Sequence, residues 1–330
     1  MFHGMRMTLL LMPWTTNLTG HITSDMRDME IPRYPHFREI RIEDKHFIDD
    51  FLYHSPPSIS EYTFTNLFIW HYYYHFLWCL WDDCICILAQ PEESEPYFMP
   101  PLCKTDFKER TLAFLNHLAT NGITPTIRRV PEDMVNQFLS GEDHLHITLD
   151  RDNCDYVYRT EDLINLPGNK FHGKRNHINH FKKHHSYRYV PLTPDLAESC
   201  LELESEWCNI KHCEMYSGLL GEERALYEAL QNMQYLTFTG GVIQVNGKVE
   251  AFALGEKLNP HTAVIHIEKA NPAFDGLYQL INQEFCANQW ADTPYINREQ
   301  DLGEEGLRKA KLSYHPHHLV NKYTVSLRDT

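Results

Sequence analysis

Hydrophobic and polar positions along the first half of the chain alternate between strand spacing and helix spacing. FREIRIED leads from a strand into a helix near 43–54, and residues 76–89 predict a hairpin that turns at Asp82-Asp83. Leucines recur at helical intervals within 106–122, where Gly122 is a stop signal. The remaining elements expected in this half are a helix at 64–71, short strands at 95–102 and 124–130, and a short helix after Pro131.

The second half predicts a longer and more regular series of elements. They are a strand at 188–192, helices at 194–209 and 219–233, two strands joined by an Asn246-Gly247 turn within 240–256, a strand at 261–270, a helix at 276–290, a strand at 293–297, a helix within 297–316 and a last strand at 318–327. This order is typical of an acetyltransferase-type domain, and the first half is a less regular version of it.

The fold class expected is therefore α/β (α+β), with two tandem acetyltransferase-like domains. Each domain should be a mixed, mainly antiparallel sheet flanked by helices. The domain limits expected are 31–165 and 166–330, after an N-terminal extension at 1–30. The second domain carries most of the candidate chemistry.

Composition and charge narrow the class of protein. The chain has 330 residues, of which 42% are hydrophobic, and its formal net charge of −15 argues against general coating of nucleic acid or anionic membrane. Nine scattered cysteines without a CxxC pair favour neither a zinc site nor a disulfide framework, and free thiols indicate a cytoplasmic protein. The apolar run Thr8–Trp14 is too short to span a bilayer, so residues 1–30 are expected to be poorly ordered, with alternative starts at Met26 or Met29.

A basic segment at 170–188 carries positive charge, opposite in sign to the net charge of the whole chain. No acidic residue occurs between Asp162 and Asp195. A helix anchored by its apolar positions would present the donors Lys174, Arg175, Asn176 and Asn179, which suit phosphate or carboxylate. The segment is either a solvated helix that balances the acidic remainder or a docking surface for a polyanion such as tRNA or a nucleotide-containing donor. Its histidines have no acidic or cysteine ligand nearby in sequence, so no metal site is expected.

The strand at 261–270 ends in a carboxylate. Strand alternation places His266 and Glu268 on one face beside a helix start, where partial burial would suit Glu268 to act as a general base. The alternative is an edge glutamate paired with Lys257 or Arg308. The turn that follows, NPAFDGLYQ, has one glycine and an aspartate and is a poor cradle for the pyrophosphate of coenzyme A.

The stretch NREQDLGEEGLRKAKLSYHP (297–316) predicts a helix after Gly303. Its acidic first turn and basic later turns suit the helix dipole and allow i,i+4 pairs, so most of its charge is ordinary surface chemistry. Leu307, Ala310 and Tyr314 are expected to form the buried stripe. Lys311 lies beside that stripe and either snorkels outward or points into a cleft, and the cleft is the interpretation adopted.

Several motifs also resemble a known family. YRTEDLINLPGNKFHGKRNHINHF, AVIHIEKA with GLYQLINQEF, and YINREQDLGEEGLRKAKLSYHP are similar to the stand-alone relatives of the phosphatidylglycerol lysyltransferase catalytic domain, over about Phe37 to Tyr323. The resemblance implies a tandem acetyltransferase-like fold in which donor and acceptor meet in the second domain. It implies that the donor faces Lys174, Arg175, Asn176, Asn179 and Arg298, and that Glu268 lies in the reaction cleft.

The reaction expected is direct transfer of an aminoacyl group from aminoacyl-tRNA to an amine or hydroxyl, without a covalent enzyme intermediate. Glu268 would deprotonate the acceptor through water, while Lys311 and Arg308 would stabilise the developing charge. The substrate cleft is expected to be lined by Trp207, His266, Asn297, Asp301 and Tyr314. No tightly bound cofactor is expected, and the acceptor would be a small molecule or a lipid headgroup.

Two other functions remain open at this point. One is an acyl-CoA-dependent N-acetyltransferase acting on a small amine, for which acyl-CoA would be the co-substrate. The other is a non-catalytic RNA- or ligand-binding module that has kept the same fold.

Overall fold

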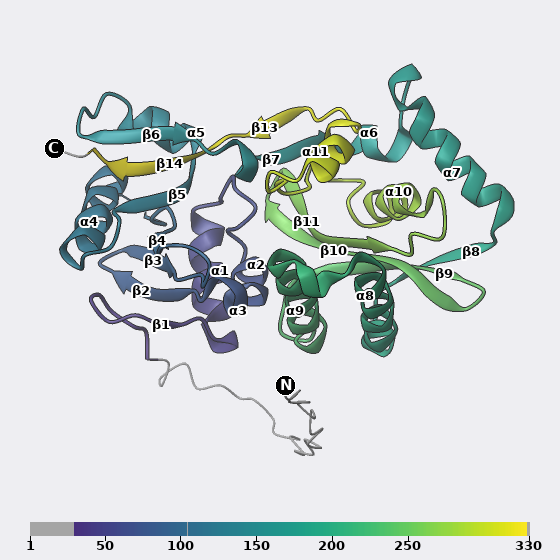
Figure 1. Cartoon of the computed structure of the whole chain (residues 1–330), viewed down its shortest axis with the longest axis horizontal. Helices are drawn as coiled ribbons and strands as arrows, with labels where there is room; N and C mark the ends of the chain where they lie inside the picture. Colours follow the sequence, from purple (N-terminus) through teal and green to yellow (C-terminus); the bar gives the residue numbers. More distant parts are fainter. Residues whose placement is uncertain (1–29, 104, 329–330) are drawn as a thin grey trace, which may run out of the picture. The chain divides into compact units, whose positions relative to one another are not determined.

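Two seven-stranded sheets organise the residues that this computed structural model describes, 30–103 and 105–328 (Figure 1). The first sheet has the order β1-β2-β3-β4-β5-β14-β6 and the second the order β13-β7-β12-β11-β10-β9-β8. Most neighbouring strands are antiparallel, whereas β4–β5 and β11–β12 are parallel pairs. Helices flank both sheets, so the predicted fold class is confirmed. The extension predicted at 1–30 lies outside the described residues, apart from Glu30.

The strands follow the predicted order, with two additions at β6 and β7. The first sheet contains β1 (Arg38–Glu39), β2 (Leu77–Trp81), β3 (Cys84–Ala89), β4 (Tyr97–Phe98), β5 (Thr126–Pro131), β6 (Leu145–Leu149) and β14 (Lys322–Leu327). The second contains β7 (Asp155–Arg159), β8 (Tyr187–Pro191), β9 (Thr239–Val245), β10 (Lys248–Asn259), β11 (Thr262–Ala270), β12 (Tyr295–Asn297) and β13 (His318–Val320).

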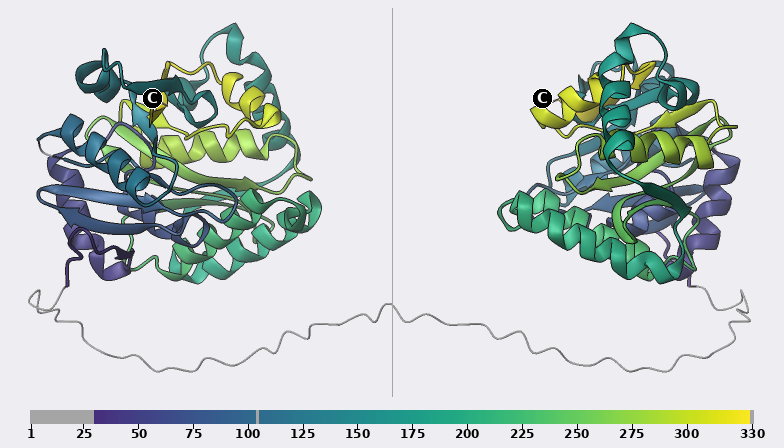
Figure 2. Two further views of the ribbon diagram at one scale, coloured as in Figure 1. Left: turned by 60° about the vertical axis from the view of Figure 1, so that its left-hand side comes forward. Right: turned by 90° about the vertical axis from the view of Figure 1, so that its right-hand side faces the viewer.

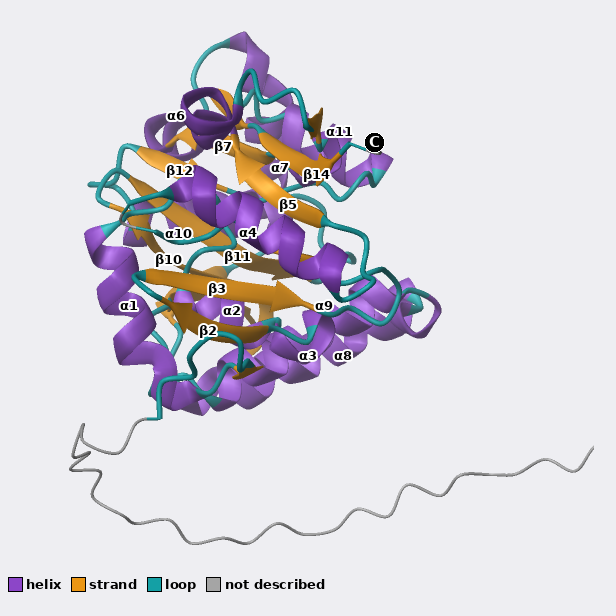
Figure 3. Ribbon diagram, turned by 90° about the vertical axis from the view of Figure 1, so that its left-hand side faces the viewer, coloured by secondary structure: helices purple, strands orange, loops and turns teal. Residues whose placement is uncertain are grey.

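Apolar side chains cover both faces of the first sheet. α4 (Phe107–Thr120) lies against one face, where Phe114, Leu115 and Leu118 are buried with Phe98 (Figure 3). α1 (Lys45–His54) and α2 (Phe64–Ile69) contribute to the core on the other face, which includes Trp78. α3 (His71–Tyr74) and the short α5 (Glu132–Met134) complete this half.

Two layers of helices enclose the second sheet (Figure 2). α8 (Ala197–Lys211) and α9 (Ser217–Gln231) cover one face, and their apolar residues join the core that also contains α1 and α2. α10 (Leu277–Gln289) covers the other face with α6 (Thr160–Asn165) and α7 (His172–His184). α11 (Glu305–Leu312) lies on the same side of the sheet, near α6 (Figure 1). The sheet therefore lies between two sets of helices, α8 and α9 on one face and α6, α7, α10 and α11 on the other. The two sets can differ in charge.

The chain crosses between the sheets twice, which the sequence did not predict. β7 precedes residue 165 yet belongs to the second sheet, where it pairs with β12 and β13. The predicted final strand at 318–327 is divided at Asn321, so that β13 ends in the second sheet and β14 enters the first between β5 and β6. The two halves are therefore interleaved at their shared border, and the limits 31–165 and 166–330 stay a prediction.

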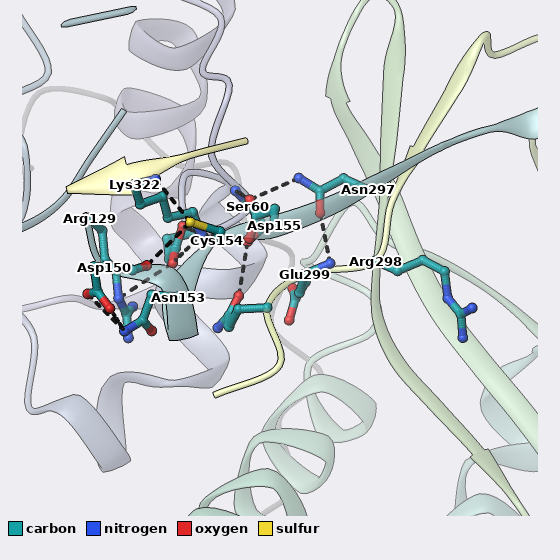
Figure 4. A network of polar contacts seen from close by, with 12 residues as sticks. Ser60, Arg129, Asp150, Asn153, Cys154, Asp155, Asn297, Arg298, Glu299 and Lys322 are labelled. Atoms are coloured by element: carbon teal, nitrogen blue, oxygen red, sulfur yellow. Dashed lines mark hydrogen bonds and ion pairs between the residues drawn. The ribbon is translucent and has the colours of Figure 1, made fainter. Parts of the chain in front are cut away.

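A buried network of charges lies where β14 begins (Figure 4). The Lys322 ammonium has no exposed surface and donates to both carboxylate oxygens of Glu61 at 2.7 Å and to Asp155 at 2.6 Å. Asp155 also accepts from Ser60 and from the Asn297 amide at 3.0 Å. The Lys322 cation thus holds three segments together: its own strand β14, the strand β7 and the segment around Glu61. The free-energy cost of burying this cation is offset by its two carboxylate partners.

The cysteines depart from the prediction of free thiols. Cys84 is bonded to Cys103, and Cys208 is bonded to Cys213. The remaining five cysteines are free and buried. None of the described helices combines the length and apolar character that a membrane span requires.

Removing the buried cation should destabilise the fold strongly. A Lys322→Met substitution leaves Glu61 and Asp155 buried without their partner, so we expect the free energy of unfolding to fall by about 3–5 kcal/mol. Urea denaturation measures this difference. The matched control is Lys309→Met at an exposed position of α11, for which we expect a change within about 0.5 kcal/mol. Equal effects of the two substitutions would contradict this role of Lys322.

Candidate active site

Two parallel strands diverge at the centre of the second sheet. β11 pairs with β12 only from Thr262↔Tyr295 to Val264↔Asn297, although β11 continues to Ala270. No other described strand pairs with the rest of this β11 edge. Ligands of open α/β sheets commonly bind where the carboxyl ends of neighbouring parallel strands separate. The side chains at this divergence are therefore the candidates for chemistry.

An ion pair spans the divergence. The Arg298 guanidinium donates to one oxygen of Glu268 at 3.0 Å, and the Asn282 amide of α10 donates to the other oxygen at 2.9 Å. The two charged side chains are only 15% and 11% exposed. Arg298 also lies against two aromatic rings, with its guanidinium carbon 4.9 Å from the centroid of Tyr314 and 5.8 Å from that of Tyr158. The Arg298 side chain extends away from Lys322 and Asp155 (Figure 4).

Two lysines from distant parts of the chain add to this cluster. The Lys174 ammonium of α7 lies 4.2 Å from the centroid of Tyr314, the ring that Arg298 also contacts. Lys311 of α11 donates to the main-chain carbonyls of Arg298 and Glu299. Burial lowers the pKa of both lysines to about 8, and the neighbouring Arg298 charge adds to this shift. Glu268 opposes the shift at Lys174, whereas Glu299, Asp155 and Glu268 oppose it at Lys311. The cluster thus holds three cationic groups beside Glu268, with Glu299 and Asp155 close enough to act on Lys311.

The turn after β12 places Arg298 and contains residues with positive φ. Glu299 has φ +56° and Leu302 has φ +53°, which are uncommon values for residues other than glycine. The Asn297 carbonyl oxygen of the side chain accepts from the Glu299 N–H at 2.8 Å, and the backbone of Tyr156 bonds to both Arg298 and Glu299. Such a conformation persists when surrounding contacts hold it. Asn297 is therefore a support of the turn, buried behind it.

His266 holds the other side of the same turn. Its ring bonds to Glu299 at 2.8 Å and to Glu256 at 2.9 Å, and Asn66 of α2 also bonds to Glu299. Burial alone would lower the pKa of His266, but the two carboxylates outweigh it and raise the pKa to about 9. The prediction that His266 and Glu268 share one face is wrong. The β10–β11 register shifts between Leu254↔Ile267 and Gly255↔Ile265, and this bulge at His266 interrupts the alternation of side chains.

α11 has an orientation opposite to the predicted one. Leu307 is 40% exposed and Ala310 is exposed, so neither belongs to a buried stripe, although Tyr314 is buried as predicted. Arg308 and Lys311 point inward instead. Arg308 binds Asp301, in the loop before its own helix, through two hydrogen bonds at 2.9 and 2.8 Å, and it also binds Asp152, which lies between β6 and β7. Asp301, a predicted cleft residue, is fully buried in this pair and with Tyr156.

Other predicted site residues lie apart from the cluster. Arg175 donates to the carbonyls of Leu166 and Gly168 at the end of α6. Asn176 bonds to His172 on the exposed side of α7, and Asn179 is exposed. Trp207 belongs to the opposite face of the sheet, where its ring contacts Lys269. In the KRNHIN segment of α7, Lys174 is the residue that lies near Glu268 and Arg298.

Sequence reasoning missed several side chains that complete the cluster. Tyr158 lies on β7, a strand that was not predicted, and its hydroxyl donates to the Lys311 carbonyl at 2.8 Å. Asn282 lies on the predicted α10 helix, but an isolated asparagine on a helix carries no chemical signal of its own. Glu299 lies within the charged stretch 297–316, where nothing in its sequence neighbours distinguishes it. Two surface hollows, one around His71 and His75 and one around Asn246 and Lys248, are lined by no member of the cluster.

The paired sheets and the divergent strands define an acyltransferase-type fold with two acetyltransferase-like halves. The family of the phosphatidylglycerol lysyltransferase C-terminal region matches residues 54–326, and the chain belongs to this family. The family is described as that of a lysyltransferase, an enzyme that transfers an acyl group.

Several known proteins are similar to the chain. A conserved protein from Bacteroides thetaiotaomicron is 36% identical, with a TM-score of 0.82 over 88% of this chain and 99% of the other. The structure of L-PGS from Bacillus licheniformis is 12% identical, with a TM-score of 0.62 over 91% and 95% of the two chains. FemX is 10% identical, with a TM-score of 0.54 over 89% and 97%.

A curated relative from Mycoplasmoides gallisepticum is 24% identical over 179 residues. This match covers 52% of the chain and 56% of the relative. The chain therefore matches little more than half the length of that relative.

Lys174 should react with acylating reagents faster than an ordinary surface lysine. Its pKa of about 8 leaves half of the amine uncharged at pH 8, so we expect acetylation by N-hydroxysuccinimidyl acetate at least about tenfold faster than at Lys183. Lys183 is the matched control because it is exposed on the same helix. Mass spectrometry of peptides after brief labelling measures both rates. Slower labelling of Lys174 than of Lys183 would contradict the lowered pKa.

The His266 charge should stabilise the fold in acidic to neutral solution. Because its folded-state pKa is raised to about 9, its contribution is fully present below about pH 6.5 and is lost as the pH rises through 9. The difference in unfolding free energy between wild type and His266→Gln should therefore shrink from pH 6 to pH 9.5 in urea titrations. The exposed His261→Gln is the control, with a small difference at every pH. A His266→Gln difference that does not change with pH would argue against a buried imidazolium.

Proposed function

We propose that this protein is an acyltransferase that moves an aminoacyl group from aminoacyl-tRNA to an amine or hydroxyl acceptor. One observation carries the proposal: Lys174, Arg298 and Lys311 gather beside the Glu268 carboxylate where β11 and β12 diverge. A half-buried cluster with excess positive charge is suited to an anionic donor and to an oxyanion that forms during acyl transfer. In this proposal the acyl group is transferred directly, so no cysteine or serine nucleophile is needed.

Each cation has a distinct role in this proposal. Arg298 is fixed by Glu268, which in turn accepts a hydrogen bond from Asn282, and would stabilise the negative charge that builds on the ester carbonyl. Lys174 would bind a phosphate of the donor beside the Tyr314 ring. Lys311, with a pKa of about 8, can exchange a proton near neutral pH and would give a proton to the ribose oxygen as its bond to the carbonyl carbon breaks, which forms the ribose hydroxyl.

Glu268 and Arg308 are better suited to positioning than to proton transfer. Both oxygens of Glu268 accept hydrogen bonds, one from Arg298 and one from Asn282, so this carboxylate orients the guanidinium. Arg308 holds Asp301 and thereby the loop between β12 and α11. In this form of the proposal, Glu268 is no longer the general base expected from the sequence.

The surroundings favour tRNA over coenzyme A as the donor. α7 presents Lys182 and Lys183 on its exposed surface and leads to Lys174 at the cluster, which suits a polyanion. The β11–α10 turn is a poor pyrophosphate site because the N–H groups of Ala273 and Phe274 are bonded to Asn271 within the turn. Its Gly276 packs against the His177 carbonyl of α7, where a Cβ would lie 2.2 Å from that oxygen.

The family's description also bears on the transferred group and the acceptor. Phosphatidylglycerol lysyltransferases move a lysyl group to a lipid headgroup, and the same pairing is one option for this chain. A small-molecule acceptor is the other option. We propose that the reaction takes place in the cytoplasm, where aminoacyl-tRNA is made.

Charge reversal on α7 should weaken tRNA binding. We expect a Lys174→Glu/Lys182→Glu variant to bind aminoacyl-tRNA at least about tenfold more weakly in 0.1 M salt, with a shallower salt dependence, because phosphate contacts are lost. Fluorescence anisotropy with labelled tRNA measures both quantities. Lys211→Glu/Arg224→Glu, on α8 and α9, is the matched control with the same change of charge. An unchanged affinity in the α7 variant, or strong binding of coenzyme A by calorimetry, would overturn the choice of donor.

Removal of the fixed guanidinium should affect the reaction more than donor binding. For Arg298→Met we expect the enzyme-dependent loss of aminoacyl ester from tRNA to slow by about 100-fold or more, with tRNA affinity changed less than about threefold. Radiolabelled aminoacyl-tRNA with a cell extract as acceptor source measures the rate. Arg159→Met, an exposed arginine at the end of β7, is the control. Equal rates for Arg298→Met and wild type would exclude a catalytic role for this site.

A further inference from the structure

The outward face of α9 is apolar. Among the described residues, seven of the twelve large hydrophobic side chains that are exposed lie on α9, beside its two ends or on the neighbouring α3: Tyr72, Ile210, Met215, Tyr216, Leu220, Tyr227 and Tyr235. α9 itself lies on the outside of the molecule, between α3 and α8 (Figure 1). Single exposed hydrophobic residues are common, whereas a group of them marks a surface that binds a partner.

Successive turns of α9 present one stripe of side chains to solvent. At about 100° per residue, its members fall within about 60° of one another, and all are exposed: Leu220, Arg224, Tyr227 and Gln231. The opposite face is also apolar and packs into the core through Ala225, Leu226, Ala229 and Leu230. A helix with apolar residues on two faces is normally covered on both. The fold of a single chain covers only one of them.

The stripe contains an arginine that is ordered before any partner binds. The Arg224 guanidinium carbon lies 4.3 Å from the ring centroid of Tyr72 and 5.4 Å from that of Tyr227. The same guanidinium is paired with Glu228 at 2.6 Å. Arginine and tyrosine are enriched in protein–protein interfaces, and side chains that are already fixed lose little conformational entropy on binding. The stripe is therefore suited to a protein partner.

Opposite charges lie on the two flanks of the stripe. Arg224 leans toward α3, whereas Glu223, about 100° round the helix, lies toward α8. The Glu223 side chain has no hydrogen-bond or ion-pair partner among the residues that the structure describes. The other two carboxylates of α9 are paired, Glu222 with Lys269 and Glu228 with Arg224. The α8 flank thus offers a carboxylate to a cation from outside the chain.

We infer that two copies of this chain associate through the outward faces of α9, with the two helices parallel. A two-fold axis along the helices brings the α3 flank of one copy against the α8 flank of the other. Arg224 then meets Glu223 of the second copy at two equivalent contacts, while Leu220 and Tyr227 each meet their own counterpart. In an antiparallel pair Arg224 would face Arg224 and Glu223 would face Glu223, and like charges across an interface are unfavourable.

This association leaves the candidate active site of each copy accessible. α7 and α11 lie on the opposite side of the second sheet from α9 (Figure 1). The dimer would carry two separate sites, each with its own basic α7 surface. The inference goes beyond the proposed acyl transfer and does not depend on it.

Sedimentation velocity over a concentration series tests the association without any substrate. We expect wild type to reach twice the 38.9 kDa mass of the chain. Leu220→Glu should weaken association at least about tenfold, because it places a charge in the stripe, and the first turn of a helix tolerates a carboxylate. Leu312→Glu on α11 is the matched control, since the two leucines are 45% and 47% exposed, and should change association less than about twofold. A monomer at every concentration, or equal effects of the two substitutions, would overturn the inference.

Cysteine cross-linking tests the parallel orientation. In a parallel pair the two copies of position 220 face each other, so Leu220→Cys should form a disulfide-linked dimer under mild oxidation with copper phenanthroline. Leu312→Cys is the control and should stay unlinked, and the five free cysteines of the described chain are buried. A dimer that forms in sedimentation but does not cross-link through Leu220→Cys would contradict the parallel arrangement.

A charge exchange between the flanks tests the ionic contact. Glu223→Arg and Arg224→Glu should each weaken association at least about tenfold, because like charges then meet at both contacts. An equal mixture of the two variants pairs opposite charges at both contacts and should associate within about threefold of wild type. Recovery in the mixture also shows that both variants are folded. Failure of the mixture to associate would overturn the contact between Arg224 and Glu223.

Discussion

The arrangement of the protein depends on one buried ammonium group. Lys322 stands at the point where the chain leaves the second sheet and enters the first, and it bonds to Glu61 from one half and to Asp155 from the other. Asp155 in turn binds Asn297, which holds the turn that bears Arg298. The same charge that joins the sheets therefore also supports the candidate site. The first half supports the candidate site through these contacts and through the hydrogen bond from Asn66 to Glu299. The Arg298–Glu268 pair itself contains no side chain from the first half.

Charge separation across the second sheet gives the site its character. Cations from α7, the β12 turn and α11 meet around Glu268, whereas glutamates from α8 and α9 meet around Lys269 on the adjacent strand position. Consecutive residues of β11 thus face opposite electrostatic surroundings. A formal net charge of −15 conceals this division, because it averages over a strongly basic helix and a strongly acidic pair of helices.

Much of the fold could be predicted from the sequence, because regular periodicity and turn signals mark the elements of the second half. The resemblance to the family also implied that Lys174, Glu268, Arg298 and Lys311 lie at one site. The orientation of individual side chains could not be predicted. The bulge at His266 depends on the register between β10 and β11, and the exposure of Leu307 depends on Asp301 and Asp152 drawing Arg308 inward. β7 was missed because all but one of its residues are buried, so it lacks polar alternation, and the crossing at Asn321 leaves no mark in a continuous strand-like run.

The position of β14 has a consequence for how the chain is made. Among the described strands, β6 pairs with β14 alone, and β14 separates it from β5. While a ribosome is still synthesising the second half, the first sheet lacks an interior strand and β6 has no neighbour. The earlier half must then wait, partly open, for residues 322–327 to emerge. Folding of the first sheet is in this way coupled to the synthesis of residues 322–327 rather than proceeding strictly from the N-terminal side.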